Sequence, residues 1–147
     1  MVKMILISHR GNISGKKPEF ENNPSYVQSA VSNGYECEID VWYVNGNFYL
    51  GHDNPEHKIN YEFLQDNKFW CHAKNLESLE IILKDDKIHC FWHETDKYTI
   101  TSKKYIWAYP GSIVTGNYKS ICVLPELNDQ CIKNFSGLCS DFIESYK

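Results

Sequence analysis

Two carboxylates two residues apart, Glu38 and Asp40, lie inside an apolar run of the sequence. Residues i and i+2 of a β-strand point to the same face, so a strand through this run would aim both carboxylates at one place. Two buried negative charges repel each other unless a cation lies between them, and a hard divalent ion suits carboxylate oxygens. A solvated strand end with the carboxylates apart is the alternative. The apolar flanks imply burial and favour a metal site at Glu38 and Asp40.

Two histidines, His9 and His52, could carry acid–base chemistry next to these carboxylates. Imidazole titrates near neutral pH, so one histidine can accept a proton while a second donates one. A lone histidine is more often structural than catalytic. Here the two stand at strand ends that the predicted topology brings towards Glu38 and Asp40, which favours a catalytic pair.

The dipeptide Asn45-Gly46 predicts a tight β-hairpin, because both residues readily adopt the positive φ of a two-residue turn. A turn this short cannot make a parallel crossover, which needs about a dozen residues. Folding about it sets Val44 opposite Asn47. The same pairing, continued along the chain, returns His52 close to Asp40.

Arg10 and Lys74 supply positive charge at the ends of two other predicted strands. A guanidinium group can bind a phosphate through two parallel hydrogen bonds, and an ammonium group can stand beside it as a point charge. Salt bridges to the nearby carboxylates are the alternative. Of the remaining histidines, we expect His57 in a surface loop, His89 in a structural role, and His93 at a strand end where it could line the pocket.

Eight short apolar runs could be the strands that position these residues. Most are continuous and rich in Ile, Val, Trp, Phe and Cys, which is typical of strands buried on both faces. The runs are Met4–His9, Tyr35–Val41, Phe48–His52, Lys68–His72, Ile88–His93, Tyr105–Tyr109, Ser120–Leu124 and Gly137–Ile143. Polar residues gather at their C-terminal ends, which is the edge where parallel α/β folds build their sites.

Three of the connectors are predicted to contain helices. The first has Asn23 as its N-cap and Pro24 at its first position, and ends at Asn33-Gly34. Asn75 is the predicted cap of the second helix. A third and weaker helix is predicted over Asn128–Phe135. Strands that alternate with helices indicate parallel strands joined by crossovers.

Without the hairpin arm Phe48–His52, seven parallel strands are predicted, and Ser112–Thr115 could be a short eighth. A barrel of eight strands and eight helices takes about 250 residues. This chain has 147 and is predicted to form one domain, residues 1–147. We therefore predict an α/β, compact TIM-barrel-like (β/α) fold, closed or open, with several outer helices shortened or missing and a β-hairpin over the C-terminal end of the second strand.

Composition and charge exclude several classes of function. The net charge of −4 argues against binding of nucleic acid, which needs basic patches to displace counterions. No stretch approaches the about 20 apolar residues of a membrane span, and the first apolar run is too short for a signal peptide. We therefore expect a cytoplasmic protein with no membrane span and with reduced, buried cysteines. A homo-oligomer is an option if a sheet edge stays open.

Four motifs occur in the order and spacing of a known enzyme signature: His9-Arg10-Gly11, Glu21-Asn22, Glu38-Ile39-Asp40-Val41 and Gly51-His52-Asp53. Over roughly residues 5–53 the chain resembles the glycerophosphodiester phosphodiesterase family. The resemblance continues more weakly at His72-Ala73-Lys74 and Ser140-Asp141. Phospholipases D of the spider-venom type are a more distant likeness.

The resemblance implies a role for each motif. Histidines matching His9 and His52 act as acid and base in that family. Carboxylates matching Glu38 and Asp40 hold one divalent ion, Mg²⁺ or Ca²⁺. Basic residues matching Arg10 and Lys74 hold the phosphate, and a glutamate matching Glu21 lies near the site as a further candidate ligand.

The chain departs from the family pattern at His72, two residues before Lys74, where the family usually has a third acidic ligand. Histidine can bind a metal, but it lowers the negative charge of the site by one. This change tilts the preference towards Mn²⁺ or Zn²⁺. A weakened metal site with reduced activity is the alternative.

The function predicted from these residues is a metal-dependent phosphodiesterase that hydrolyses a glycerophosphodiester or a related small phosphodiester. One alternative is a catalytically weakened protein of the same fold that binds a phosphodiester or a metal. Another is a lyase, which transfers the phosphate to an internal hydroxyl and stops at a cyclic product.

Overall fold

A ten-stranded sheet organises the chain, and the computed structural model describes it over residues 3–116 and 118–147. The strands are β1 Ile5–His9, β2 Glu36–Val44, β3 Asn47–Leu50, β4 His57–Ile59, β5 Phe69–Ala73, β6 Cys90–Phe91, β7 Tyr98–Ile100, β8 Ile106–Ala108, β9 Ser120–Val123 and β10 Gly137–Ser140. The α-helices in this part of the chain are α1 Pro24–Ser32 and α2 Leu76–Leu83. Short 3₁₀ helices cover Tyr61–Gln65, Pro125–Leu127 and Ile143–Tyr146.

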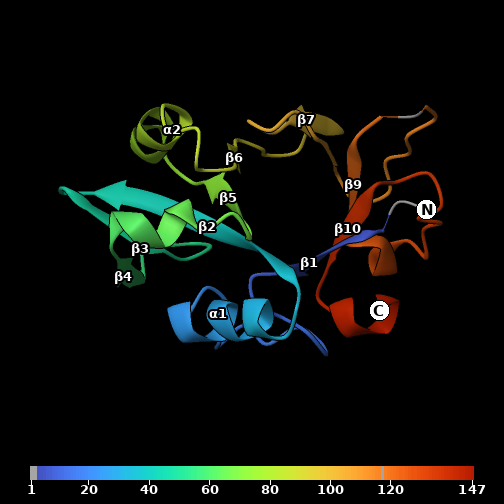
Figure 1. Cartoon of the computed structure of the whole chain (residues 1–147), viewed down its shortest axis with the longest axis horizontal. Helices are drawn as coiled ribbons and strands as arrows, with labels where there is room; N and C mark the ends of the chain where they lie inside the picture. The colour runs from blue at the N-terminus through green and yellow to red at the C-terminus, as the bar shows by residue number, and fades with distance from the viewer. Residues whose placement is uncertain (1–2, 117) are drawn as a thin grey trace.

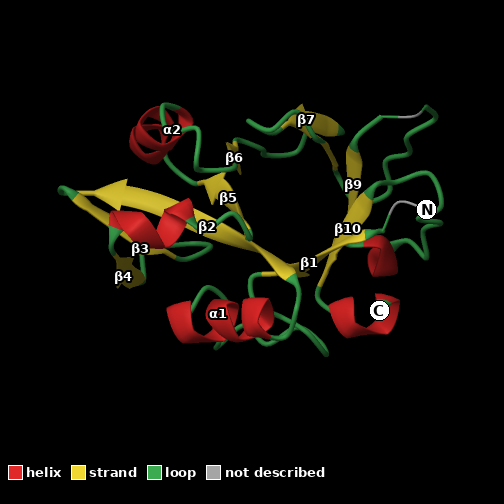
Figure 2. Cartoon of the chain, viewed as in Figure 1, coloured by secondary structure: helices red, strands yellow, loops and turns green. Residues whose placement is uncertain are grey.

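Seven of the strands are parallel, in the order β6, β5, β2, β1, β10, β9, β8. This confirms the seven parallel strands that the sequence predicts. Figures 1 and 2 show that they curl round a common axis, which makes the fold barrel-like. The last strand of the path, β7, pairs with β8 in the antiparallel sense.

Hydrogen bonds link the two ends of this curl. The backbone N–H of Ser102, just after β7, donates to the carbonyl of Cys90 in β6 at 2.8 Å. The Thr99 hydroxyl donates to the carbonyl of Trp92 at 2.9 Å. The edge of β6 that no further parallel strand covers is therefore hydrogen-bonded by the arm Thr99–Ser102.

The predicted hairpin is present and has the predicted register, with Val44 opposite Asn47. Its position is set by the carbonyls along one edge of β2. The carbonyl of Glu38 accepts the N–H of Arg10, and the carbonyl of Asp40 accepts the N–H of Gly51. Since carbonyls two residues apart point to the same edge of a strand, β3 continues the row that β1 begins. The chain after β3 is thereby carried over the C-terminal end of β1.

The two predicted helices with asparagine caps are confirmed. The side chain of Asn23 accepts the N–H of Ser25 at the start of α1. Asn75 does the same for Ser78 at the start of α2, and its side chain also pairs with both backbone groups of Tyr43. The helix α2 is thus attached to the far end of β2.

The third predicted helix, Asn128–Phe135, is wrong. Only Pro125–Leu127 forms a single 3₁₀ turn, and Asp129 has a φ of 46°. A left-handed residue cannot continue a right-handed helix. The side chain of Gln130 instead pairs with the backbone of Gly111 and Ser112.

Other differences concern the short strands. β6 keeps only two residues of the predicted run Ile88–His93, and Ser112–Thr115 is not a strand. The strands β4 and β7 were not predicted, and His57 belongs to β4 rather than to a loop. These strands are three residues long, too short for a period of two to stand out in the sequence.

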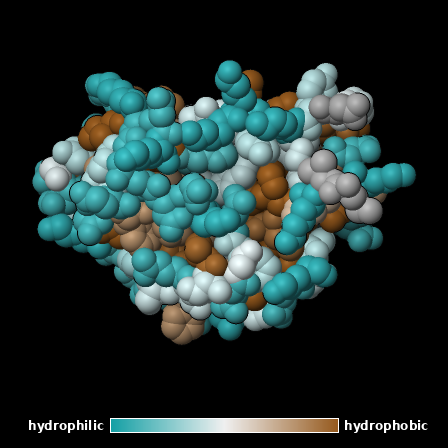
Figure 3. All heavy atoms as spheres, viewed as in Figure 1, coloured by the Kyte–Doolittle hydropathy of each residue, from teal (hydrophilic) through white to brown (hydrophobic). Residues whose placement is uncertain are grey.

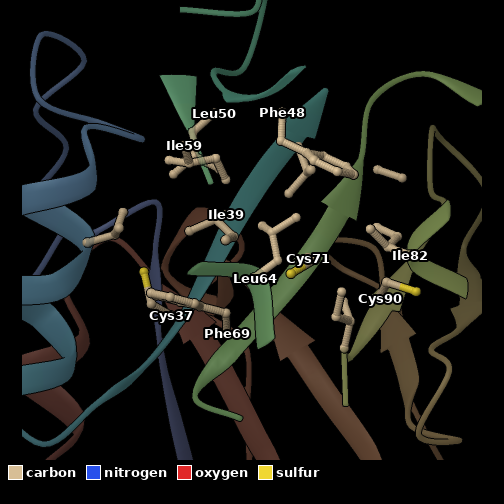
Figure 4. Close-up of a cluster of buried hydrophobic side chains, with 14 residues drawn as sticks. Cys37, Ile39, Phe48, Leu50, Ile59, Leu64, Phe69, Cys71, Ile82 and Cys90 are labelled. Carbon is tan, nitrogen blue, oxygen red and sulfur yellow. The ribbon is translucent and has the colours of Figure 1, made fainter. Parts of the chain in front are cut away.

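Five of the six cysteines are buried, and Cys131 is exposed. Figure 4 shows Cys37, Cys71 and Cys90 packed as small apolar side chains in the cluster under α2 and the hairpin. All six are free thiols. The prediction of free thiols therefore holds for all six, and the prediction of burial holds for all but Cys131, which lies in the segment wrongly predicted as a helix.

Hydrophilic residues cover most of the face shown in Figure 3, and hydrophobic ones surface in a few patches. Across residues 3–116 and 118–147, neither helix has the length and apolar character needed to cross a membrane.

A buried histidine makes the stability of this fold depend on pH. His89 is 8% exposed, is hydrogen-bonded to the Thr101 hydroxyl at 2.7 Å, and packs on the ring of Trp70 at 4.0 Å. Burial, and secondarily the positive charges of Lys103 and Lys119, lower the pKa of His89 to about 4.

We predict that His89 destabilises the fold as the pH falls from about 6.5 to about 4. In that window the unfolded chain protonates this residue and the folded chain does not, so the linkage amounts to about 2 kcal/mol near pH 5. The measurement is urea unfolding at pH 5 and pH 8, for the wild type and His89→Gln. The variant should lose this part of the pH dependence; an unchanged difference between the two pH values would show that other groups cause it.

Candidate functional site

The predicted pair of carboxylates does lie on one face of β2, and a histidine joins it from the neighbouring strand. In the register of β2 and β5, Asp40 is opposite His72. One ligand atom from each of Glu38, Asp40 and His72 lies within 4.8 Å of the others. Both carboxylates are almost fully buried, with exposures of 2% and 0%.

Two oxygens of this cluster are buried without a hydrogen-bond partner, Glu38 Oε1 and Asp40 Oδ1. The other Asp40 oxygen, Oδ2, accepts from the Asn22 amide at 2.8 Å and lies 3.3 Å from Arg10 Nε. Burial alone would raise the pKa of Asp40, but the nearby His72 ring, whose Nδ1 lies 3.3 Å from Oδ1, and the charge of Arg10 hold the pKa well below its usual range. Asp40 is thus an oriented carboxylate with one oxygen left for a cation.

The orientation of His72 is fixed by its second ring nitrogen. Nε2 lies 2.8 Å from the carbonyl of His93 and therefore carries the proton that it donates there. This leaves Nδ1 at 3.3 Å from Asp40 Oδ1 and 3.6 Å from Glu38 Oε2. A backbone carbonyl on the outer nitrogen is a common way to orient a metal-binding histidine.

The same surroundings make His72 basic. Burial lowers its pKa, but the close approach of the Asp40 and Glu38 carboxylates outweighs this and raises the pKa to about 9. As an imidazolium, His72 neutralises part of the carboxylate charge. To act as a ligand it must give up the Nδ1 proton, so a cation and a proton compete for this position.

The cluster Glu38, Asp40 and His72 fits a single divalent ion, because the three side chains converge, both carboxylates are buried and two carboxylate oxygens are unpartnered. Glu21 does not belong to this group. Its two oxygens are held by Arg10 at 3.2 Å and by the Asn12 amide at 3.0 Å. The structure therefore gives Glu21 a role in holding side chains around the site.

His9 is paired with an aspartate that the sequence did not assign to the site. His9 Nδ1 lies 2.7 Å from Asp141 Oδ1, and Nε2 lies 3.8 Å from Glu38 Oε1. Burial raises the pKa of Asp141, but hydrogen bonds with His9 and Asn12 outweigh it and lower the pKa below its ordinary value. A carboxylate on Nδ1 sets the tautomer that directs Nε2 towards Glu38.

Asp141 is missed from the sequence because its role depends on strand pairing. The register of β1 and β10 sets Ser8 opposite Ser140, so the next residues of the two strands, His9 and Asp141, emerge side by side. The two are 132 positions apart in the chain. The signals in the sequence are that Asp141 lies towards the end of the apolar run Gly137–Ile143 and that Ser140-Asp141 weakly continues the family resemblance.

A buried asparagine, Asn12, ties the first loop to this pair. Its amide donates to both Asp141 and Glu21, and its carbonyl oxygen accepts from the Tyr26 hydroxyl and the N–H of Lys17. The preceding Gly11 has a φ of 98°, and a Cβ there would lie 2.4 Å from the Tyr26 ring. The sequence His9-Arg10-Gly11 therefore needs its glycine for space.

His52 lines the same cleft as His9, on the loop that follows β3. Its side chain is 43% exposed, and Nδ1 lies 2.9 Å from Asp53 Oδ1. The loop is tight: a Cβ on Gly51 would lie 1.9 Å from the Asn54 carbonyl oxygen, and the indole N–H of Trp42 donates to the Gly51 carbonyl at 2.6 Å. The hairpin thus brings the two predicted catalytic histidines to one cleft.

The two basic residues predicted to hold phosphate differ in their partners. Arg10 forms salt bridges with Glu21 and Asp40, which is the alternative role considered for it, while still lining the cleft. The pKa of Arg10 is raised, because the charges of Asp40 and Glu38 outweigh the effect of burial. Lys74 lines the cleft, and no carboxylate of the described residues lies within 4 Å of its ammonium group.

The cleft has a volume of about 440 Å³. Its charged and polar lining residues are His9, Arg10, Glu38, His52, His72, Lys74, His93, Glu94 and Thr95. Its other residues are Trp107, Tyr109, Pro110, Val123, Leu124 and Leu127. His93, expected from the sequence as an option, does line it.

The chain was compared with protein-family models, curated proteins and solved structures, and none of them matches it.

We predict that a divalent ion binds at Glu38, Asp40 and His72 and stabilises the fold. At 100 times its Kd an ion adds about 2.7 kcal/mol, which raises the Tm of a chain of this size by roughly 5–10 °C. The measurement is thermal unfolding with EDTA, Mg²⁺, Ca²⁺, Mn²⁺ or Zn²⁺. Asp40→Asn should abolish the shift, and Glu80→Gln, an exposed control on α2, should keep it.

The histidine in this cluster should also affect which ion is preferred. The wild type should respond more to Mn²⁺ or Zn²⁺, and His72→Glu should move the preference towards Mg²⁺ or Ca²⁺. An equal shift in the wild type and in Asp40→Asn would place the binding site elsewhere.

Proposed function

We propose that this protein is a metal-dependent phosphodiesterase built on a shortened TIM barrel. Its substrate is a glycerophosphodiester or a related small phosphodiester. The observation that carries the proposal is that one cleft is lined by Glu38 and His72, from the buried cluster with unpartnered carboxylate oxygens, and by both His9 and His52. The resemblance of the four N-terminal motifs to glycerophosphodiester phosphodiesterases supports the same reaction.

In this proposal Glu38, Asp40 and His72 hold the ion, which when bound polarises the phosphodiester and offsets charge in the transition state. Lys74 provides a positive charge for the phosphate that no neighbouring carboxylate takes up. Arg10, held in place by Glu21 and Asp40, adds a second positive charge that lines the cleft.

His9 is the residue best prepared to accept a proton. When Nδ1–H is donated to Asp141, Nε2 is the ring nitrogen left to take up a proton. Asp141 also stabilises the imidazolium that forms. His52, on the hairpin loop, donates a proton to the leaving oxygen. Attack by water gives hydrolysis, and attack by a neighbouring hydroxyl of the substrate gives a cyclic phosphate.

A second candidate function is binding without efficient turnover. It is favoured by the position of His72, whose Nδ1 lies within 3.6 Å of both Glu38 and Asp40 and can neutralise them as an imidazolium. Such a protein would bind a phosphodiester at Lys74 and Arg10 and release it unchanged.

The test is phosphodiester turnover by the purified chain. We expect release of nitrophenolate from bis(p-nitrophenyl) phosphate, and of the alcohol from glycerophosphodiesters, that depends on an added ion and stops with EDTA. His9→Ala and Asp40→Ala should each lower the rate by about 100-fold or more. Folded protein with no turnover of any diester under any ion would favour the binding function.

The partner of His9 allows a sharper prediction. Asp141→Asn should lower kcat by about 10²- to 10⁴-fold with little change in KM, because the amide no longer sets the tautomer of His9 or stabilises its charge. The acidic limb of the pH–rate profile should shift or disappear. Asp86→Asn, an exposed control, should leave kcat and the profile unchanged; a loss confined to protein stability in Asp141→Asn would mean that Asp141 is only structural.

A further inference from the structure

We propose that the phosphodiester substrate carries a hydrocarbon group on one of its two ester oxygens, which packs on an apolar wall of the cleft. The wall consists of Trp107, Tyr109, Pro110, Val123, Leu124 and Leu127. This inference rests on the proposed function and adds the class of substrate to it.

The two kinds of lining residue come from different strands. The charged and polar residues lie in or just after β1, β2, β3, β5 and β6, whereas the apolar wall is formed by β8 and β9 and the residues after them. Since β8 and β9 are hydrogen-bonded neighbours, the residues of the wall come from one side of the curled sheet. The cleft therefore has one polar and one apolar region.

Part of the wall is exposed beyond what packing requires. Trp107 is 4% exposed and belongs to the core, but Tyr109 is 40% and Leu127 66% exposed. A single exposed leucine is ordinary. A continuous apolar surface beside a polar, metal-binding cluster is the usual composition of a small-molecule site, where apolar area provides affinity and a few polar groups set the orientation.

The backbone conformation of Leu124 also bears on the apolar wall. This residue follows β9 with φ 49° and ψ 57°, a left-handed conformation that costs a residue with a side chain about 1 kcal/mol or more. Glycine or asparagine is the usual choice in such a position. Leu124 packs on the core cluster that contains Trp107 and Val123, and it also lines the cleft, so this strained residue adds apolar surface to the wall.

The charges of the cleft determine which part of a substrate meets the wall. The phosphate anion is attracted to Lys74, Arg10 and the cation cluster, all on the polar side. A diester anchored there has two substituents. Polar groups such as glycerol match the region of His52, His93 and Glu94, so the second substituent faces Tyr109, Leu124 and Leu127.

The experiment is turnover of a series of soluble glycerol 3-phosphate diesters in which the second alcohol is methanol, butanol or hexanol, followed by phosphorus NMR. We expect kcat/KM to rise with chain length, by up to about fourfold for each methylene, which is the factor for complete transfer of a CH₂ group from water. Leu127→Ser should flatten this rise, because it removes part of the apolar wall. Leu83→Ser, a 51% exposed leucine at the end of α2, is the matched control and should keep the rise.

The outcomes separate this inference from the function on which it rests. No turnover of any ester would reject the phosphodiesterase. Equal turnover of methyl and hexyl esters, or a rise that Leu127→Ser does not alter, would keep the enzyme and reject the apolar wall as a specificity site. A second arm compares the monomeric hexyl ester with vesicles of phosphatidylglycerol: cleavage of the ester alone indicates free amphiphilic diesters, and cleavage of both indicates a lipid head group, each in agreement with the wall.

Discussion

Two negative charges buried on one strand are the constraint around which this structure is arranged. Glu38 and Asp40 are almost inaccessible to water, and burial of such charges is very unfavourable without compensation. The chain supplies positive groups from two directions, Arg10 after β1 and His72 in β5. Asn22 fixes one oxygen of Asp40, and yet one oxygen of each carboxylate stays without a partner. An arrangement that offsets most of the charge and leaves two acceptors open is suited to a cation.

The chain is short because, in the part that the structure describes, most of the outer helices of a barrel are missing. The strands whose C-terminal ends build the site are present. Within the described residues two α-helices pack outside the curled sheet, and other crossovers are loops or 3₁₀ turns. Asparagine side chains fix several of these loops by hydrogen bonds. Asn12 binds the first loop to Asp141, just after β10, and Asn22 binds it to Asp40 of β2. Asn75 binds α2 to Tyr43 of the hairpin. Where a further strand is missing beside β6, the arm at Thr99–Ser102 provides the hydrogen bonds.

Local signals were sufficient for much of the fold. The seven parallel strands, the two capped helices and the hairpin at Asn45-Gly46 were all predicted, because apolar runs, capping residues and turn residues act over a few positions. The errors lie where long-range contacts override those signals. Residues 128–135 have a helical pattern, but Gln130 is bound to the loop at Gly111 and the backbone at Asp129 is left-handed. The three-residue strands β4 and β7 exist because of their neighbours and carry little pattern of their own.

The sequence by itself determined which residues could do the chemistry and that Glu38 and Asp40 share a face, because spacing along one strand is a local property. It also placed His52 near them through the hairpin. Only the tertiary structure decided that Asp141 is the partner of His9 and that Glu21 serves Arg10 and Asn12. The apolar wall of the cleft was decided in the same way. The reason is that partners far apart in the chain meet only through strand order and register, which depend on the packing of the whole sheet.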